Sequence, residues 1–421
     1  MKILNVLNVS NLSNLQADSG YVFQKLLMKE ILRQRPDWEY FFIVPKGAEH
    51  IDDRIQNIEL EFGSNKYEVR FHFPWYDLKK RLETILPKVD LIHINQSEQT
   101  ANFRALASSL LPSRRIPLVT YFHYLPIDPS RALGFSPEKY DSAAQMIVNS
   151  CSTNLSFDET LNLHNLALPI FMRQIEALMV ADQSIICSEF GIDLLVGNAQ
   201  KLVPDITPKI TAIPPPISFE ESEPGRSTVK DKNKVIVFNH RLYNHYGPKE
   251  FFNFMDSFYA NVRTDFEVVI TDPTFGRSSE RNKLDSSFSS TREKLLNKPY
   301  VRLEHFKERS EYYRRLGGYK LSIGPFKPSA LWSMSVVDTM ACGVPVACPR
   351  YACFPELLGR DSPLLFSSLE ELSQLIQRLL DDEDFYRNSS KECLTRVEKF
   401  KVEKTAYEFI KIFEELSRYE K

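Results

Sequence analysis

Short apolar runs alternate with amphipathic stretches along most of the chain. The apolar runs are rich in β-branched and aromatic residues and are apolar throughout, as expected for strands that are covered on both faces. The predicted strands are Ile3–Val9, Tyr40–Val44, Leu91–Asn95, Leu118–Phe122, Ser184–Cys187, Ile210–Ile213, Val235–Asn239, Phe266–Thr271, Leu321–Gly324 and Val344–Cys348. Repeated strand–helix units of this kind predict an α/β fold with doubly wound, parallel sheets and right-handed crossovers.

One break interrupts this alternation, at Pro214–Lys234. The segment begins with three consecutive prolines, which disfavour a helix or a central strand, and it is otherwise polar and charged. We therefore expect two Rossmann-like domains, residues 1–213 and 235–400, joined by a stiff linker at 214–234. A last amphipathic segment within residues 401–421 packs either on the second domain or back on the first.

Composition and charge narrow the class of protein. The 421 residues suffice for two or three domains, and a formal net charge of −2 excludes a wholly basic nucleic-acid coat. No run of 18 apolar residues is present, and the N-terminal residues lack the features of a signal peptide, so we expect a cytoplasmic protein without integral membrane association. The six cysteines include no CxxC pair, which favours reduced thiols and no metal site.

Several common catalytic motifs are missing from the sequence. No strand is followed by GxGxxG or GxxxxGK[ST], and HExxH and GxSxG do not occur. Oxidoreductase, ATPase and hydrolase functions are therefore disfavoured.

The junction Ile323–Pro349 carries the most informative pattern. It is expected to form a strand, an irregular loop, a helix that starts near Ser333–Ser335, a tight turn and a second strand. Small residues at a helix start leave backbone N–H groups accessible to an anion, and the Asp338 carboxylate, one turn later, can accept a hydrogen bond from a sugar hydroxyl. The structural alternative is an ordinary capped helix with Asp338 solvated or salt-bridged.

This junction resembles the nucleotide-sugar-binding signature of GT-B glycosyltransferases, especially the family-four-like retaining group. Trp332 takes the aromatic place of that signature, Ser333 its second glycine and Asp338 its second acid, followed by MACGVPVACP. The resemblance implies that the backbone of Ser333, Met334 and Ser335 holds the donor diphosphate and that Asp338 binds the ribose. The first acid of the signature falls on Ala330, which leaves the identity of the donor sugar open.

A second resemblance follows the linker, in VFNHRLYNHYGPKEFFNF. It implies that Arg241 binds the diphosphate and stabilises its developing charge, as a planar bidentate donor can. The family's lysine falls on Tyr246, and Lys249, three residues further on, is the candidate replacement.

The N-terminal half matches the family less distinctively. His123 ends the strand-like segment VTYFHYLP and is implied as the catalytic residue near the donor sugar and the acceptor. Ser19 and Gly20 open the first helix, where related enzymes place a glycine-containing loop against the donor diphosphate.

The implied protein is a GT-B glycosyltransferase, a retaining hexosyl- or pentosyltransferase that uses a UDP-linked donor as co-substrate, with no cofactor and no metal. The segments FNHRLYNHYGPKEFF and VACPRYACFPELL resemble most the queuosine mannosyltransferases of tRNA and the bacteriophage DNA glycosyltransferases. Residues 277–302, with seven Lys/Arg against three acids, agree with a nucleic-acid partner. The preferred acceptor is a hydroxymethylated pyrimidine in DNA. The alternatives are a glycan, lipid, protein or tRNA base as acceptor, and a non-catalytic GT-B-like binding module.

Overall fold

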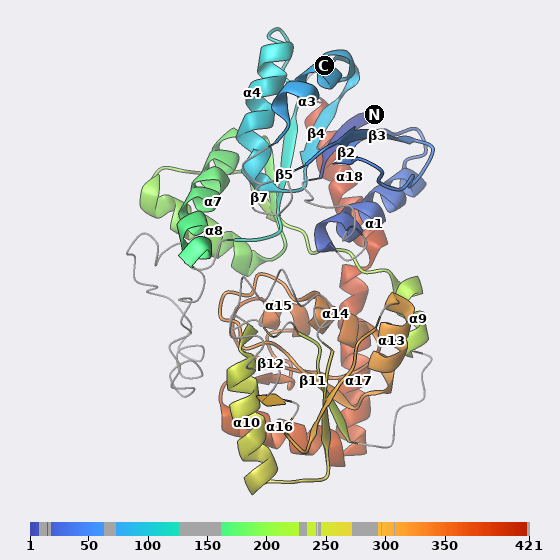
Figure 1. The fold of residues 1–421 in the computed structure, drawn as a ribbon, viewed down its shortest axis with the longest axis vertical. Coiled ribbons are helices and arrows are strands. Elements are labelled where there is room, and N and C mark those ends of the chain that lie inside the picture. The colour runs from blue at the N-terminus through green and yellow to red at the C-terminus, as the bar shows by residue number, and fades with distance from the viewer. Residues whose placement is uncertain are drawn as a thin grey trace. The chain divides into compact units, whose positions relative to one another are not determined.

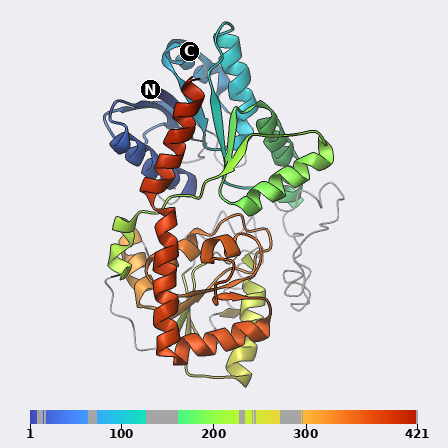
Figure 2. The same cartoon turned by 180° about the vertical axis from the view of Figure 1, so that it is seen from behind.

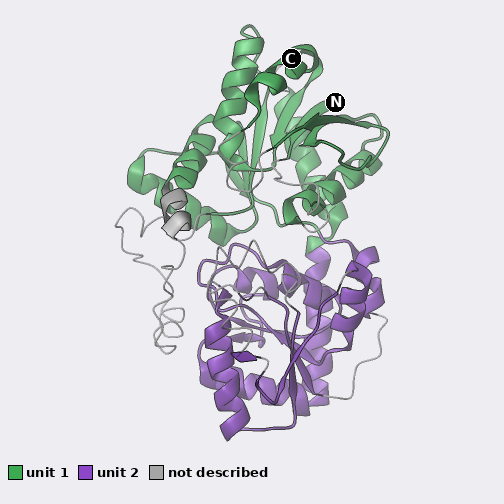
Figure 3. Ribbon diagram, in the orientation of Figure 1, with its two compact units in different colours: residues 1–134, 166–216, 400–421 green, residues 135–165, 217–399 purple. Residues whose placement is uncertain are grey.

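The computed structural model describes residues 1–7, 15, 18–62, 73–125, 161–226, 234–240, 242, 246–271, 294–295, 297–306 and 308–418 (Figure 1). These residues form two compact units, each built on its own parallel sheet (Figure 3). Unit 1 contains the described residues of 1–134, 166–216 and 400–421. Unit 2 contains the described residues of 135–165 and 217–399.

Unit 1 is organised around a seven-stranded parallel sheet in the order β3-β2-β1-β4-β5-β6-β7. Its strands are β1 (Lys2–Val6), β2 (Glu39–Pro45), β3 (Ile55–Leu60), β4 (Leu91–Ile94), β5 (Leu118–Phe122), β6 (Gln183–Ile186) and β7 (Ile210–Ala212). Ile3 of β1 pairs with Tyr40 on one side and with Leu91 on the other. The strand order reverses between β1 and β4, and in open α/β sheets ligands bind beyond the carboxyl ends of the strands at such a reversal.

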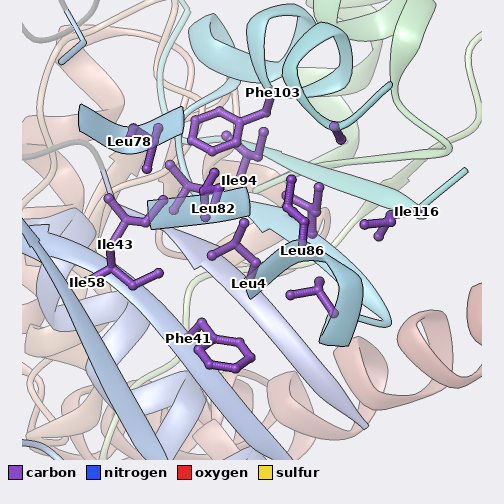
Figure 4. Close-up of a cluster of buried hydrophobic side chains, with 14 of the residues drawn as sticks. Leu4, Phe41, Ile43, Ile58, Leu78, Leu82, Leu86, Ile94, Phe103 and Ile116 are labelled. Carbon is purple, nitrogen blue, oxygen red and sulfur yellow. The ribbon is translucent and has the colours of Figure 1, made fainter. Parts of the chain in front are cut away.

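Helices cover both faces of this sheet (Figure 1). They are α1 (Ser19–Gln34), α3 (Trp75–Ile85), α4 (Thr100–Leu110), α7 (Leu161–Val180), α8 (Glu189–Leu202) and α18 (Val402–Arg418). On the α3 and α4 side, a cluster of buried apolar side chains joins the sheet to the helices (Figure 4); it includes Leu4, Ile43, Leu82, Ile94 and Phe103. Full burial of each such side chain contributes about 1.5–3 kcal/mol.

Helix α18 belongs to unit 1 although it follows the whole of unit 2 in sequence. It packs beside α1, and Figure 2 shows the two helices together, α18 in red and α1 in blue. Phe409 and Phe413 of α18 are fully buried, and both contact the ring of His93 in β4. The amphipathic pattern of this segment is thus satisfied by the apolar surface of the first unit.

Unit 2 contains a six-stranded parallel sheet in the order β10-β9-β8-β11-β12-β13. Its strands are β8 (Val235–Phe238), β9 (Glu267–Ile270), β10 (Val301–Leu303), β11 (Leu321–Ile323), β12 (Val346–Pro349) and β13 (Leu365–Phe366). Its helices are α9 (Phe219–Arg226), α10 (Pro248–Asn261), α13 (Arg309–Gly318), α14 (Met334–Ala341), α15 (Phe354–Leu358), α16 (Leu369–Asp381) and α17 (Glu383–Val397). Here the strand order reverses between β8 and β11.

The α/β class and the parallel sheets are confirmed, and each of the ten predicted runs overlaps a strand. Three strands were not predicted: β3, β10 and β13. Each lies at the edge of its sheet, where a strand is not enclosed on both sides, and β3 alternates polar and apolar residues instead of forming an apolar run. Within the segment expected as a linker, residues 219–226 form α9, which packs on α13.

Candidate functional site

The carboxyl ends of β8 and β11 lie next to the first turn of α14 in unit 2. His240 follows β8 by two residues and is almost completely buried, with 3% of its surface exposed. Its Nε2 lies 3.0 Å from the carbonyl oxygen of Ile323, at the end of β11. Because a carbonyl oxygen only accepts, Nε2 carries the proton and donates it.

The other ring nitrogen of His240 reaches α14. Ser335 Oγ lies 2.6 Å from His240 Nδ1, and Ser333 Oγ lies 3.2 Å from Ser335 Oγ. Since Nε2 holds the proton of the neutral ring, Nδ1 accepts from the Ser335 hydroxyl, and Ser335 Oγ in turn accepts from Ser333. Burial lowers the pKa of His240 to about 3, so the ring is neutral at physiological pH.

This hydroxyl chain leaves the N-terminus of α14 without a side-chain cap. Ser333 is the N-cap residue, but its hydroxyl makes no capping hydrogen bond. In contrast, side chains of Asp18, Ser188 and Ser368 accept from backbone N–H groups at the starts of α1, α8 and α16. The first turn of α14 therefore offers uncapped backbone N–H groups, which together with the helix dipole favour an anion.

Asn239, the residue before His240, also binds the first turn of α14. Its Nδ2 lies 3.0 Å from the Ser335 carbonyl oxygen and 2.9 Å from Tyr312 Oη. Its Oδ1 accepts from the Ser322 hydroxyl of β11 at 3.2 Å. Two consecutive side chains after β8 thus hold Ser335, one by its hydroxyl and one by its backbone.

Asp338 lies one turn further along α14, is 6% exposed and is joined to helix α13. The Tyr313 hydroxyl donates to Asp338 Oδ1 at 2.7 Å and accepts from Arg309 at 2.8 Å. Arg309 also pairs with Asp338 Oδ1 at 3.5 Å and with Glu221 of α9 at 2.9 Å. Burial raises the pKa of the Asp338 carboxyl above its ordinary value, while Arg309 and the Tyr313 hydroxyl act in the opposite direction.

The structure describes some of the remaining donor candidates of unit 2. Arg241 lies outside the described residues. Lys249 is exposed in the first turn of α10, whereas Ala330 is buried. Tyr246 stacks on His240 with ring centroids 6.5 Å apart, and the Lys327 ammonium lies 5.1 Å from the centre of the Tyr246 ring. Lys327, on the loop between β11 and α14, thus adds a positive charge that the sequence did not point to.

The candidates of unit 1 lie at the strand-order reversal of its sheet. His123 follows β5 directly and is partly buried, with its ring against Phe23 and Tyr121. Ser19 is exposed at the start of α1, and Gly20 is buried. The Gly20 N–H donates to Asp18 Oδ1 at 2.9 Å, so the first turn of α1 already holds a carboxylate.

Among the described residues, no group of His, Cys, Asp or Glu side chains is arranged to hold a metal ion. None of the helices described is both long and apolar enough to cross a membrane. The cysteines at 187, 342, 348, 353 and 393 are buried, and none of these five is in a disulfide bond.

A family model described as glycosyl transferases group 1 matches one stretch of the chain, residues 219–394, which is most of unit 2. This stretch contains His240, the first turn of α14 and Asp338. No curated protein sequence matches the chain.

Comparison with solved structures defines the fold of the whole chain as GT-B. Sucrose-phosphate synthase from Thermosynechococcus elongatus has a TM-score of 0.66 at 13% identity over 99% of both chains. Trehalose 6-phosphate synthase from Burkholderia multivorans also has a TM-score of 0.66, at 10% identity over 99% of both chains. HepE from Anabaena, solved with UDP and glucose, has a TM-score of 0.61 at 14% identity over 98% of this chain and 99% of its own.

Proposed function

We propose that the protein is a glycosyltransferase that takes a sugar from a nucleotide-diphosphate donor. One observation carries the proposal: the uncapped first turn of α14 and the buried Asp338 one turn later lie within the stretch that matches glycosyl transferases group 1. The backbone N–H groups of Met334 and Ser335 bind the diphosphate, and Asp338 accepts from a ribose hydroxyl. UDP is the proposed nucleotide because HepE, which shares the fold, was solved with UDP and UDP-glucose.

Catalysis in this proposal is electrostatic. As the bond between sugar and phosphate breaks, negative charge develops on the departing diphosphate, and fixed dipoles and cations stabilise it. The helix N-terminus of α14 supplies the dipole. Arg241 supplies a bidentate cation and Lys249 a second positive charge. His123 is the proposed catalytic residue of unit 1. Retention of the anomeric configuration belongs to the same proposal and follows from the sequence resemblance.

The proposed acceptor is a hydroxymethylated pyrimidine in DNA. Its support is the sequence resemblance to nucleic-acid-base glycosyltransferases and the basic composition of residues 277–302. A sugar or sugar phosphate is the second candidate, because the structural neighbours include a sucrose-phosphate synthase and a trehalose 6-phosphate synthase. A panel of acceptors separates the two: DNA duplexes with hydroxymethylated pyrimidines, unmodified duplexes, and hexose phosphates.

The donor half of the proposal is tested by calorimetry with UDP, GDP and ADP, followed by assays of nucleotide release from the corresponding sugars. One nucleotide is expected to bind and to be released in the presence of an acceptor. Arg241→Ala is expected to lower kcat/KM about a hundredfold, which corresponds to roughly 3 kcal/mol in the barrier. Arg387→Ala, at an exposed pair with Asp384, is the control. Binding of no nucleotide, or transfer by Arg241→Ala within twofold of wild type, would refute the respective claim.

A further inference from the structure

Three side-chain amides are completely buried beneath the strand-order reversal of unit 1. Asn5 lies in β1, Asn95 directly follows β4, and Gln24 lies in the second turn of α1; all three are 0% exposed. Burial of an amide costs free energy unless its polar atoms are paired. Here a chain of hydrogen bonds that ends at His123 pairs these atoms, except for Asn5 Oδ1, which is buried without a partner.

One backbone carbonyl determines the direction of this chain. Asn95 Nδ2 lies 3.1 Å from the Gly20 carbonyl oxygen, which only accepts, so the amide nitrogen of Asn95 faces Gly20. Asn95 Oδ1 consequently points the other way. It accepts from Gln24 Nε2 at 2.7 Å and from His123 Nε2. The Gln24 oxygen, now oriented, accepts from Asn5 Nδ2 at 2.5 Å.

From this order of donors and acceptors we propose that Asn95 and Gln24 are positioning residues that hold His123 as the Nε2–H tautomer. In this tautomer the ring proton lies on the nitrogen that faces Asn95. The Phe23 ring meets the imidazole edge-on, with centroids 4.8 Å apart, and Tyr121 contacts it at 4.4 Å, so the packing restrains ring rotation as well.

The partner of Nε2 is an amide and not a carboxylate. A carboxylate there would stabilise the doubly protonated, cationic ring, whereas the Asn95 oxygen brings no charge. In this arrangement the Nε2 proton of His123 stays on the ring, and the ring is held in one orientation at the end of β5. This assignment deepens the proposed function and rests on it for the identity of the substrate, although the tautomer itself does not depend on it.

The tautomer is tested directly by NMR on the full-length protein labelled with ¹⁵N-histidine. Long-range ¹H–¹⁵N correlation distinguishes a protonated ring nitrogen from an unprotonated one, and His123→Gln identifies the signals of this ring among the eight histidines. A single Nε2–H form at neutral pH is expected. An Nδ1–H form, or a mixture of the two, would overturn the proposal whether or not the protein proves to be a glycosyltransferase.

The positioning role is tested with Asn95→Leu and Gln24→Met, which keep similar volumes and remove the polar atoms. Both are expected to release the ring into a mixture of tautomers and to lower kcat for sugar transfer about tenfold or more, since small misplacements of a reacting contact are costly. UDP affinity is expected to stay within twofold, because the proposed nucleotide contacts are in unit 2. Gln56→Met, at an exposed position of β3, is the matched control.

A variant that unfolds is recognised by circular dichroism and replaced by Asn95→Ser, which keeps a small polar side chain. Unchanged kcat in a folded variant whose ring has lost its single tautomer would overturn the positioning role. If UDP does not bind the wild-type protein, the proposed function is refuted. The NMR experiment still decides whether His123 is held as the Nε2–H tautomer, because it does not depend on UDP.

Discussion

Ser335 donates its hydroxyl proton to Nδ1 of His240, with 2.6 Å between the two atoms, so the first turn of α14 is tied to the end of β8 by a neutral imidazole. The hydroxyl that would otherwise cap the helix or contact an anion is thereby committed to the protein. This relationship separates two roles of Ser335. Its side chain stabilises the fold, and its backbone N–H is the group proposed to face the diphosphate.

Ser335→Ala is accordingly expected to affect stability more than nucleotide binding. The variant leaves the buried Nδ1 of His240 without a donor, which costs about 1–3 kcal/mol in the free energy of unfolding. The UDP dissociation constant is expected to change by less than about threefold. Urea unfolding and calorimetry measure the two quantities, with exposed Ser257→Ala as the control. A tenfold loss of UDP affinity at unchanged stability would show instead that the hydroxyl contacts the phosphate.

Asp338→Asn is expected to weaken UDP binding about tenfold to hundredfold, because hydrogen bonds to charged groups are worth about 1.5–3 kcal/mol. The side chain keeps its size, and Tyr313 can still donate to the amide oxygen, so the fold should be retained. Asp384→Asn, at an exposed carboxylate, serves as the control. Equal affinity of Asp338→Asn and wild type would exclude the proposed ribose contact and leave Asp338 as the structural partner of Tyr313 and Arg309.

Two lysines compete for the second positive charge of the donor site. Lys249 is exposed in the first turn of α10, and Lys327 lies over Tyr246, which stacks on His240. The variants Lys249→Met and Lys327→Met, measured against Lys391→Met on exposed α17, show which of the two contributes. Substitution of the lysine that contacts the diphosphate is expected to lower UDP affinity about tenfold and to leave uridine affinity almost unchanged. If neither variant changes the UDP dissociation constant, Arg241 would be left as the only candidate side-chain cation.

Buried histidines give the stability of each unit a defined pH dependence. Burial lowers the pKa of His93 in unit 1 and of His240 in unit 2 to about 3, from an ordinary value of 6.5. Above pH 6.5 both rings are neutral in the native and unfolded states, and the stability is fully present. As the pH falls below 6.5, the unfolded state binds protons that the native state does not, so the free energy of unfolding decreases until about pH 3.

The expected loss is about 1.4 kcal/mol per ring at one pH unit below the unfolded pKa. His93→Leu is expected to flatten the pH dependence of the unit 1 transition in urea and to leave that of unit 2 unchanged. His50→Gln, at an exposed ring beside Asp53, is the control. An equally steep pH dependence in His93→Leu would show that the His93 ring is not kept neutral by burial.

The sequence predicted the central strands of both sheets because these strands are apolar along their whole length. It did not predict β3 and β10, because these two strands mix polar and apolar positions, or β13, because this strand has only two residues. Ser333, Ser335 and Asp338 were predicted because they share one short motif. The contact between Ser335 and His240 was not predicted, because the two residues are 95 positions apart in the sequence. The contact between Gln24 and Asn95 in unit 1 was not predicted either, because these residues are 71 positions apart. Such pairs meet only through tertiary structure.

The return of α18 to unit 1 also determines the order in which the two units can be completed during synthesis. Ribosomes add about 5–20 residues per second, so residues 217–399 take roughly 10–40 s to appear after the strands of unit 1 have been made. Throughout that interval the apolar surface around Phe23, His93 and Tyr121 has no covering helix. Unit 2 therefore has all of its chain before unit 1 does, and the nascent first unit keeps this apolar surface uncovered until α18 has been made.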